Sequence, residues 1–382
     1  MKNLAYIPLF ALLLFPAAAW SNTITVMKDG TGDYTLLQPA ADAAAAGDTL
    51  LIGPGRYEEV TEFYFNSGVR RDAHLVVRVD NLTILGMDRD TVIIGPTVPT
   101  IAQGDPVGLV VAQNVSVTHI EKMTFENTWV GVYSLGDFLI DDCVAQYCKF
   151  GFEPEGPLTI DHSTMHNNED GIHVPFTAGL IRISHCELTD NAGYGITLGS
   201  PQEAQISYTH IKGGSVGIQF DDCPGFIENC TIENIMYSGI VLLESGAVVT
   251  IADNTLRNNG WHLDINSYAT VDLHQNQLLD SQLYGIWIRS PSAVHVNEND
   301  LISSQGYLAY LTGDTAPEIK HYDFTNNYWG TIDPAEIAAR IYDNHDSALE
   351  TGIVDFEPFA GAPVPTEATS FGGLKALFRG GR

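Results

Sequence analysis

Short apolar runs recur along most of the chain and are separated by polar turns. In the middle of the sequence each repeat has an apolar residue, two mostly polar residues, a small or amide residue, a variable residue and another apolar residue. A marker glycine, or its replacement, then occurs once per repeat, at Gly131, Gly151, Gly171, Gly195, Gly217, Gly239, His262, Gly285 and Leu308. Apolar and polar residues alternate over three or four positions at a time, which predicts short strands rather than helices.

A period in the low twenties that is built from strands is typical of a β-solenoid. We therefore predict an all-β, single-stranded right-handed parallel β-helix of about ten coils. Leucine-rich repeats have a similar period, but their L-x-x-L-x-L-x-x-N spacing is absent here.

Aligning the coils predicts two columns of interior residues. The small position is occupied by Cys143, Ser163, Cys186, Thr209, Cys230, Asn254, Asn276, Asn299 and Asn327. Two residues later stand Ala145, Met165, Leu188, Ile211, Ile232, Leu256, Leu278 and Leu301. At a strand spacing of about 4.8 Å, each Asn amide can donate to one neighbouring coil and accept from the other. We expect a hydrogen-bonded ladder beside an apolar one, with the cysteines of the first column as buried fillers.

Both ends of a solenoid need a cap, because the last coil otherwise exposes its core. Residues 36–46, with their alanine run, predict an amphipathic helix that covers the N-terminal end and stops at Gly47. Residues 334–342 predict a short helix at the other end, with Asp333 as its N-cap.

The N-terminal segment has the pattern of a secretory signal peptide. Lys2 precedes an apolar run over residues 4–19, and small residues follow, so residues 1–21 are predicted to be removed on export. The run is shorter than the roughly 20 apolar residues that a bilayer span needs. We expect a mature β-helix over residues 22–360 and no transmembrane span, with the protein secreted to the extracellular space, the periplasm or the cell surface.

The C-terminal segment differs from the rest of the chain in charge. Residues 361–370 are rich in Pro, Thr and Ala and predict a linker, and residues 371–382 have three basic side chains and no acidic one. Apolar residues recur in this tail at helical spacing, although about nine residues cannot hold a helix alone in water. We predict a docking or sorting tag for export or surface machinery, with a disordered tail as the alternative.

The formal charge of −29 limits the partners. Such a surface repels nucleic acids and anionic membranes. It is compatible with calcium, a neutral glycan or a basic partner.

Family resemblance is carried by motifs at the two ends of the repeat region. DGTGDY at 29–34, GDTL at 47–50 and GPGRYEE at 53–59 resemble the opening of secreted right-handed β-helix proteins, including pectin esterases. NNYWGT at 326–331 and DFEPF at 355–359 resemble the closing segment of periplasmic copper-accessory and carbohydrate-binding or sugar-hydrolase type β-helix proteins. The resemblance implies the fold. It does not extend to chemistry, because the Q-D-T-L, D-F-I-F-G and L-G-R-P-W segments of pectin esterases are absent.

One candidate site lies on the turns at the two polar positions that precede the small residue of each coil. Stacking places Asp142, His162, His185 and Tyr208 in one row, which could act as general acid and base. The other interpretation is a metal site, whose predicted ligands are Asp141, Asp142, Asp161, His162 and His185. Calcium needs six or more oxygen ligands, and this set has only three carboxylates. Calcium and a divalent transition metal are therefore both kept as candidate ions. The alternative is an ordinary solvated turn.

A second candidate site is an outward column that follows the marker glycine. Its predicted substrate-binding residues are Glu153, His173, Gln219, Asp264, Trp287 and Arg289. Aromatic rings stack on sugar faces, while amides, carboxylates and guanidinium groups bind hydroxyls, so this column suits a glycan chain. An ordinary strand surface is the alternative.

Three functions are compatible with these patterns. The first is an exported β-helix that binds polysaccharide or has a structural role at the cell envelope. The second is a polysaccharide lyase or glycoside hydrolase that uses the Asp and His residues of the turns. The third is an accessory protein for periplasmic metalloenzyme maturation, which rests on the closing-segment resemblance alone.

Overall fold

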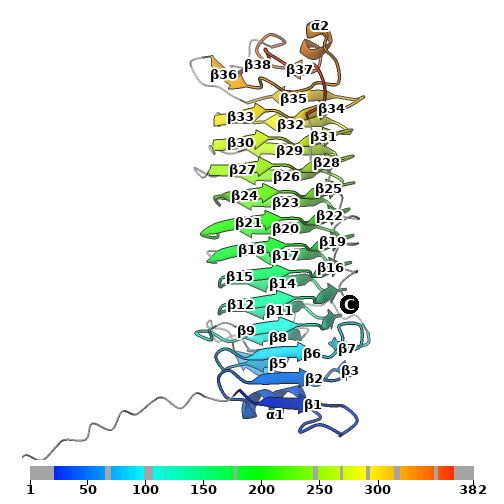
Figure 1. Cartoon of the computed structure of the whole chain (residues 1–382), viewed down its shortest axis with the longest axis vertical. Coiled ribbons are helices and arrows are strands. Elements are labelled where there is room, and N and C mark those ends of the chain that lie inside the picture. The colour runs from blue at the N-terminus through cyan, green and yellow to red at the C-terminus, as the bar shows by residue number, and fades with distance from the viewer. Residues whose placement is uncertain are drawn as a thin grey trace, which may run out of the picture.

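The chain winds into a column of stacked coils that is closed by a short helix at each end (Figure 1). The structure is a computed structural model that describes residues 21–64, 70–98, 106–116, 118–175, 179–243, 248–266, 270–289, 293–313, 319–347 and 352–364. Three parallel sheets run along the column, and the fold is an all-β right-handed parallel β-helix of about 11 turns. The predicted signal peptide up to residue 20, the linker from residue 365 and the tail lie outside the described residues.

Sheet A contains 14 of the described strands and provides the first strand of each coil. In order along the column its strands are β1 (Thr23–Val26), β2 (Thr49–Ile52), β6 (Thr83–Gly86), β9 (Thr118–Glu121), β12 (Phe138–Asp141), β15 (Leu158–Asp161), β18 (Leu180–Ser184), β21 (Glu203–Ser207), β24 (Gly225–Glu228), β27 (Val248–Ala252), β30 (Thr270–His274), β33 (Ala293–Asn297), β36 (Lys320–Asp323) and β38 (Gly352–Asp355).

Sheet B contains 11 short strands, each separated from sheet A by a tight turn. They are β3 (Gly55–Tyr57), β7 (Val92–Ile94), β10 (Thr124–Glu126), β13 (Val144–Gln146), β16 (Thr164–His166), β19 (Glu187–Thr189), β22 (His210–Lys212), β25 (Thr231–Glu233), β28 (Thr255–Arg257), β31 (Gln277–Leu279) and β34 (Asp300–Ile302).

Sheet C contains 13 described strands and includes the marker glycines. Its strands are β4 (Thr61–Tyr64), β5 (Arg70–Val77), β8 (Val107–Val111), β11 (Val130–Ser134), β14 (Phe150–Pro154), β17 (Asp170–Val174), β20 (Tyr194–Gly199), β23 (Val216–Asp221), β26 (Ser238–Leu243), β29 (Trp261–Asn266), β32 (Tyr284–Ile288), β35 (Tyr307–Leu311) and β37 (Ile341–Tyr342). All described pairings are parallel except that of β4 with β5, which is antiparallel.

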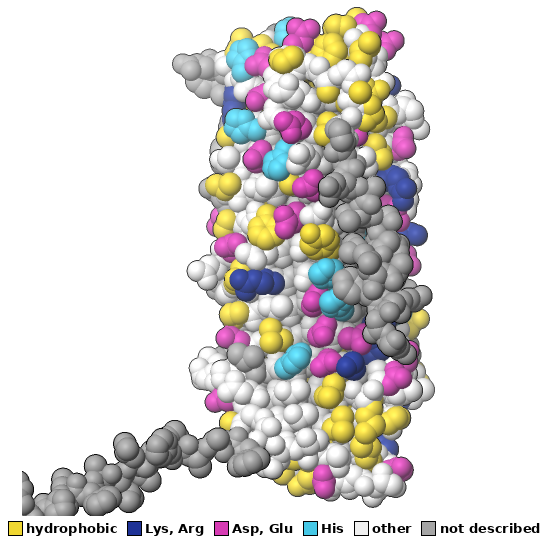
Figure 2. Space-filling model, viewed as in Figure 1, with side chains coloured by type: hydrophobic (Ala, Val, Ile, Leu, Met, Phe, Trp, Pro, Cys, Tyr) yellow, Lys and Arg dark blue, Asp and Glu magenta, His cyan; other side chains and the backbone are white. Residues whose placement is uncertain are grey.

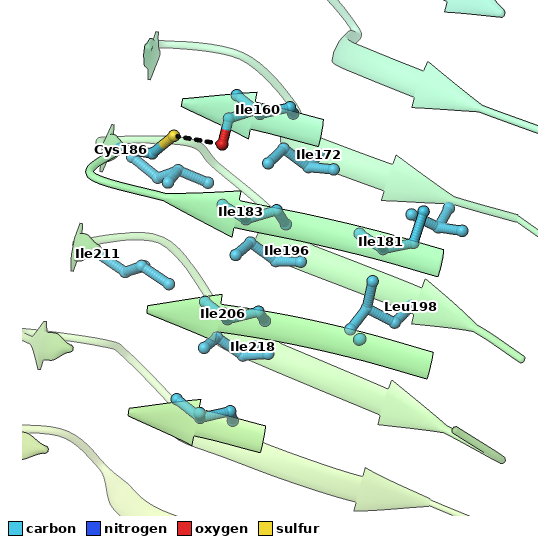
Figure 3. Close-up of a cluster of buried hydrophobic side chains, with 14 of the residues drawn as sticks. Ile160, Ile172, Ile181, Ile183, Cys186, Ile196, Leu198, Ile206, Ile211 and Ile218 are labelled. Atoms are coloured by element: carbon cyan, nitrogen blue, oxygen red, sulfur yellow. Dashed lines mark hydrogen bonds between the residues drawn. The ribbon is translucent and has the colours of Figure 1, made fainter. Parts of the chain in front are cut away.

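The core is a set of apolar columns that face the inside of the coil (Figure 3). Ile160, Ile183 and Ile206 are register partners in sheet A, and Ile172, Ile196 and Ile218 are partners in sheet C. All six side chains are at most 1% exposed. Burying one such side chain contributes about 1.5 to 3 kcal/mol, so each added coil supports its neighbours.

The predicted amide ladder is confirmed. The Nδ2 groups of Asn254, Asn276 and Asn299 each donate to the Oδ1 atom of the next Asn, at 3.0 Å, and the series ends at Asn327. The predicted apolar column two residues later is also buried throughout. Both ladders follow from the repeat alone, because parallel in-register coils place equivalent residues on top of one another.

The five cysteines are free and buried, and three of them, Cys143, Cys186 and Cys230, are the core fillers that the repeat predicted. Burial raises the pKa of Cys143, Cys186 and Cys230 to about 12. The Cys186 thiol lies 3.9 Å from the Ile160 carbonyl oxygen of the preceding coil, as Figure 3 shows. These thiols therefore serve packing rather than redox chemistry.

A second amide ladder, which the sequence pattern did not reveal, lies at the turn from sheet B to sheet C. Asn168 Nδ2 donates to Asn191 Oδ1 at 3.0 Å, and Asn168 Oδ1 accepts from the Cys148 backbone amide at 2.9 Å. The coils are also closely packed at the marker position that follows this turn. A Cβ atom on Gly131 would lie 2.4 Å from the carbonyl oxygen of Gly151, so Gly131 could be replaced only if the next coil moved.

The two predicted caps exist but are shorter than expected. Helix α1 spans Leu37–Ala43 and ends when Ala44 adopts extended dihedral angles, before Gly47 is reached. Helix α2 spans Pro334–Ala338, with the Asp333 side chain accepting from the Ala335 amide as predicted. The prediction of helix as far as residue 342 was wrong, because residues 341–342 instead extend sheet C by pairing with β35.

Candidate functional site

The turn between sheets A and B has the same left-handed conformation in successive coils. Its residues have φ values between 47° and 57°, and in five consecutive coils they are Lys122, Asp142, His162, His185 and Tyr208. Similar backbone geometry at the coil spacing makes the rings of His162, His185 and Tyr208 nearly parallel. The His162 and His185 rings are 4.9 Å apart at an angle of 6°, and the His185 and Tyr208 rings are 5.2 Å apart at 3°.

Asp142, the first member of the predicted row, is held by a residue from an earlier coil. Its Oδ1 atom lies 2.8 Å from Arg89 Nη1. Burial raises the pKa of Asp142, and the Arg89 charge opposes the shift. Asp142 is therefore already paired as a carboxylate with Arg89, in addition to its place in the predicted row.

The remaining predicted ligands form a turn cluster of Asp141, Asp161, His162 and His185. His185 Nδ1 lies 2.9 Å from Asp161 Oδ1, and His162 Nδ1 lies 3.1 Å from Asp161 Oδ2. His162 Nδ1 is also 3.4 Å from Asp141 Oδ1. Both imidazoles thus face one carboxylate, with a second carboxylate beside them, which is a donor set that could hold a metal ion.

The predicted outward column of sheet C is continuous in the structure. Thr197 pairs with His173 below it and with Gln219 above it, and the series continues through Val241, Asp264 and Trp287. Glu153 stands at the lower end, one strand before His173. At about 4.8 Å per strand, Glu153 and Trp287 are roughly 29 Å apart. The candidates therefore lie along one face but not in one pocket.

The upper end of this column is an aromatic platform made by two neighbouring columns of rings. Its members are Trp261, Tyr284, Trp287, Tyr307, Tyr310 and Tyr342, all partly exposed. The Tyr284 and Tyr310 rings are parallel at 4.2 Å, and the Trp261 and Trp287 rings are 5.2 Å apart. Rings on adjacent strands thus support one another along the long axis of the molecule.

An ion pair fixes the polar edge of the platform. Arg289 Nε lies 2.8 Å from Asp264 Oδ1, and its Nη2 lies 2.6 Å from Oδ2, so the contact is bidentate. The guanidinium carbon is also 4.5 Å from the centre of the Trp287 ring. Burial raises the pKa of Asp264, while Arg289 opposes that shift. Three predicted substrate-binding residues, Asp264, Trp287 and Arg289, therefore meet here.

A second polar group lies toward the lower end of sheet C. It is formed by Tyr133, Glu153, Glu155 and His173 and is called the Glu153 site. Burial, assisted by the Glu155 carboxylate, raises the pKa of Glu153 to about 7 despite the opposing charge of Lys149. The Tyr133 hydroxyl donates to Glu155, and burial and this bond raise the pKa of Tyr133. His173 is stacked on Phe150 at 4.4 Å, and burial lowers the pKa of its imidazole.

Sequence reasoning missed most of the platform. Trp261, Tyr284 and Tyr307 each directly precede the marker position of their coil, and Tyr310 and Tyr342 continue the Trp287 column. The recurrence of an aromatic residue before the marker was the available signal. Tyr342 could not be found in this way, because its strand falls in a segment that predicted helix.

Comparison with known proteins identifies the fold. Residues 107–259 match the sequence profile of the family described as "Right handed beta helix region". No curated protein sequence matches the chain significantly.

Among the described residues, no helix has the length and apolar character needed to cross a membrane.

Several solved structures are similar in outline at low identity. ORF18 of Geobacillus virus E2 is 13% identical over 77% of this chain, with a TM-score of 0.47, and this chain spans 60% of its length. The catalytic unit of a GH87 α-1,3-glucanase from Streptomyces thermodiastaticus is 14% identical over 93% of this chain and 71% of its own, with a TM-score of 0.44. A DFA-IIIase from Arthrobacter chlorophenolicus is 11% identical over 84% and 89%, with a TM-score of 0.46.

Proposed function

We propose that this β-helix binds a polysaccharide chain along sheet C, with the aromatic platform as the main contact surface. The observation that carries the proposal is the continuous row of partly exposed rings on β29, β32, β35 and β37. A linear polymer of sugar rings presents apolar faces at regular intervals, which flat aromatic side chains can cover. A straight, repetitive protein surface matches such a ligand better than it matches a compact small molecule.

Polar groups at the platform would orient the bound sugars. The Asp264 and Arg289 side chains hold each other in one geometry, and Arg289 stays one-third exposed beside the Trp287 ring. The Trp261 Nε1 group is shielded from solvent and has no hydrogen-bond partner among the described residues. A hydroxyl acceptor on a bound sugar would satisfy this donor, because an unpaired buried N–H costs about 1 to 3 kcal/mol.

The proposal places this activity outside the cytoplasm. Support comes from the charged start and apolar run of residues 1–21, which have the pattern of a secretory signal peptide. An extracellular, periplasmic or cell-surface location would bring the protein into contact with polysaccharides.

Binding is tested with a panel of neutral and uronic polysaccharides, followed by titration of the best ligand. Trp287→Ala and Tyr310→Ala should each weaken binding about tenfold, which corresponds to about 1.4 kcal/mol. Tyr64→Ala is the matched control, because Tyr64 is an exposed tyrosine on β4, far down the column from the platform. Equal affinities of the platform variants and the control would contradict the proposal.

Cleavage of the bound glycan is a second candidate function, and the Glu153 site favours it. A carboxyl group with a pKa of about 7 is partly protonated at neutral pH and can donate a proton to a leaving glycosidic oxygen. The neighbouring Glu155 supplies a second carboxyl group of the kind that glycoside hydrolysis requires. New reducing ends or unsaturated products that disappear in Glu153→Gln would support cleavage, and their absence from the wild-type protein would leave binding alone.

A further inference from the structure

We infer that the turn cluster binds one divalent transition-metal ion through Asp161, His162 and His185, with Asp141 as an adjacent fourth donor. Asp141 and Asp161 are the last residues of β12 and β15, and His162 and His185 lie on the turns between β15 and β16 and between β18 and β19. They are separate from sheet C, so this inference does not depend on glycan binding.

The spacing of the donor atoms fits a small coordination sphere. One donor atom from each of Asp161, His162 and His185 can be chosen so that all three lie within 4.8 Å of one another. Ligands held at about 2.0 to 2.2 Å from a tetrahedral ion are about 3.4 Å apart. The observed contacts of 2.9, 3.1 and 3.4 Å between imidazole Nδ1 atoms and carboxylate oxygens are close to that value. Metal binding would therefore require only small movements of side chains on the surface.

The charge balance at the cluster also favours a cation. Neighbouring acids have basic partners, since Glu121 pairs with Lys122 at 2.6 Å and Asp142 with Arg89 at 2.8 Å. Across the described part of the chain, the ion pairs of Asp141 and Asp161 involve only the two histidines. Two acidic side chains therefore face the histidines, and a divalent ion would balance their formal charges.

One oxygen atom provides an independent indication. Asp141 Oδ1 is shielded from solvent and accepts no hydrogen bond among the described residues, although it has the ion-pair contact with His162. A shielded carboxylate oxygen without a donor is unfavourable. A cation between Asp141 and the imidazoles would satisfy it.

The donor types select the class of metal. Two imidazole nitrogens and one or two carboxylate oxygens suit zinc, copper or nickel. Calcium prefers six to eight oxygen ligands and is disfavoured by this set. The two rings are already parallel on turns of similar conformation, so little side-chain freedom has to be lost on binding. On a surface where acidic side chains outnumber basic ones, as Figure 2 shows, a cation is also attracted from a distance.

The test is titration of the metal-free full-length chain with Zn²⁺ by calorimetry, with Ca²⁺ as a comparison ion. The wild-type protein should bind one Zn²⁺ per chain and give no such signal with Ca²⁺. His162→Asn and His185→Asn should each weaken Zn²⁺ binding, and the double variant should lose it. Asparagine is chosen because it tolerates the left-handed backbone at both positions.

His321→Ala is the matched control. His321 also contacts a carboxylate on sheet A, with its Nδ1 atom 3.0 Å from Asp355 Oδ2, and its side chain is exposed. This variant should bind Zn²⁺ as the wild type does. Absence of stoichiometric Zn²⁺ binding by wild-type protein would overturn the inference, as would equal binding by the double variant and the control. Circular dichroism of each variant checks that the coils remain folded.

Discussion

Two arginine–aspartate ion pairs, one at each candidate site, share a 2.8 Å contact but have very different surroundings. Arg89 Nη1 lies 2.8 Å from Asp142 on the turn between β12 and β13, and Arg289 Nε lies 2.8 Å from Asp264 in sheet C. The Asp142 side chain is 39% exposed, whereas that of Asp264 is 6% exposed. Water screens the first pair, so it contributes little to stability, whereas the second carboxylate depends on its arginine.

The contrast extends to the other acids of the two sites. Burial raises the pKa of Glu153 in sheet C to about 7, whereas Asp161 in the turn cluster is partly exposed and contacts two imidazoles. Sheet C therefore resembles a pre-organised, partly desolvated surface, where charges are costly and held in place. The turn cluster is an open set of ligands whose energetics depend on what binds there.

The largest effect should come from breaking the buried pair. Arg289→Leu should lower the free energy of unfolding by about 3 kcal/mol or more, because it leaves the Asp264 charge buried without a partner. The equivalent change at the turn, Arg89→Leu, should cost less than about 1 kcal/mol. Urea unfolding of both variants measures the difference. Equal losses of unfolding free energy in the two variants would show that burial does not make the Asp264 pair more important for stability than the Asp142 pair.

Adding Asp264→Leu to Arg289→Leu sharpens the same comparison. The double variant should recover much of the lost stability, since neither charge then remains buried. No recovery would indicate that Arg289 stabilises the fold through its contact with the Trp287 ring instead.

A smaller effect, with a defined pH dependence, is expected at Glu153. Its folded-state pKa of about 7 is above the ordinary value of 4.5, so the folded chain binds more protons than the unfolded chain between these values. Stability due to this group is therefore present below about pH 4.5 and is lost as the pH rises to about 7. Glu153→Gln should remove that loss and stabilise the protein above pH 7 by up to about 3 kcal/mol.

The measurement for Glu153 is the free energy of unfolding at several pH values from 4 to 8. Gln219→Ala is the control, because Gln219 lies on the same outward column and has no ionisable side chain. Its pH dependence should follow that of the wild type. If Glu153→Gln kept the pH dependence of the wild-type free energy of unfolding, the titration would belong to another group.

The smallest effect should be that of Asp161→Asn. Its side chain is 36% exposed, and its contacts with His162 and His185 are solvated, so the free energy of unfolding should change by less than about 1 kcal/mol without metal. Thermal unfolding in the presence of a chelator tests this expectation. A loss above about 2 kcal/mol would mean that the turn cluster supports the fold as strongly as the buried pair does.

Much of the fold was predictable because the repeat itself encodes the contacts. Once Asn254, Asn276 and Asn299 occupy equivalent positions, parallel stacking leaves their amides one coil apart, and the observed ladder follows. The second ladder, at Asn168 and Asn191, obeys the same rule but has fewer amides, so its period was hidden. The end of α2 was not predictable, because residues 341–342 gain hydrogen bonds from β35 that no local pattern specifies.

The candidate sites show the same division. Sequence alone determined that His162, His185 and Tyr208 share a row and that Asp264 and Trp287 share a column, because both follow from coil register. Only the tertiary structure decided that Asp142 pairs with Arg89, that Asp264 is buried against Arg289, and that Tyr342 completes the platform. Register is a property of the repeat, whereas burial, side-chain direction and contacts between different faces or coil ends depend on how the whole column packs.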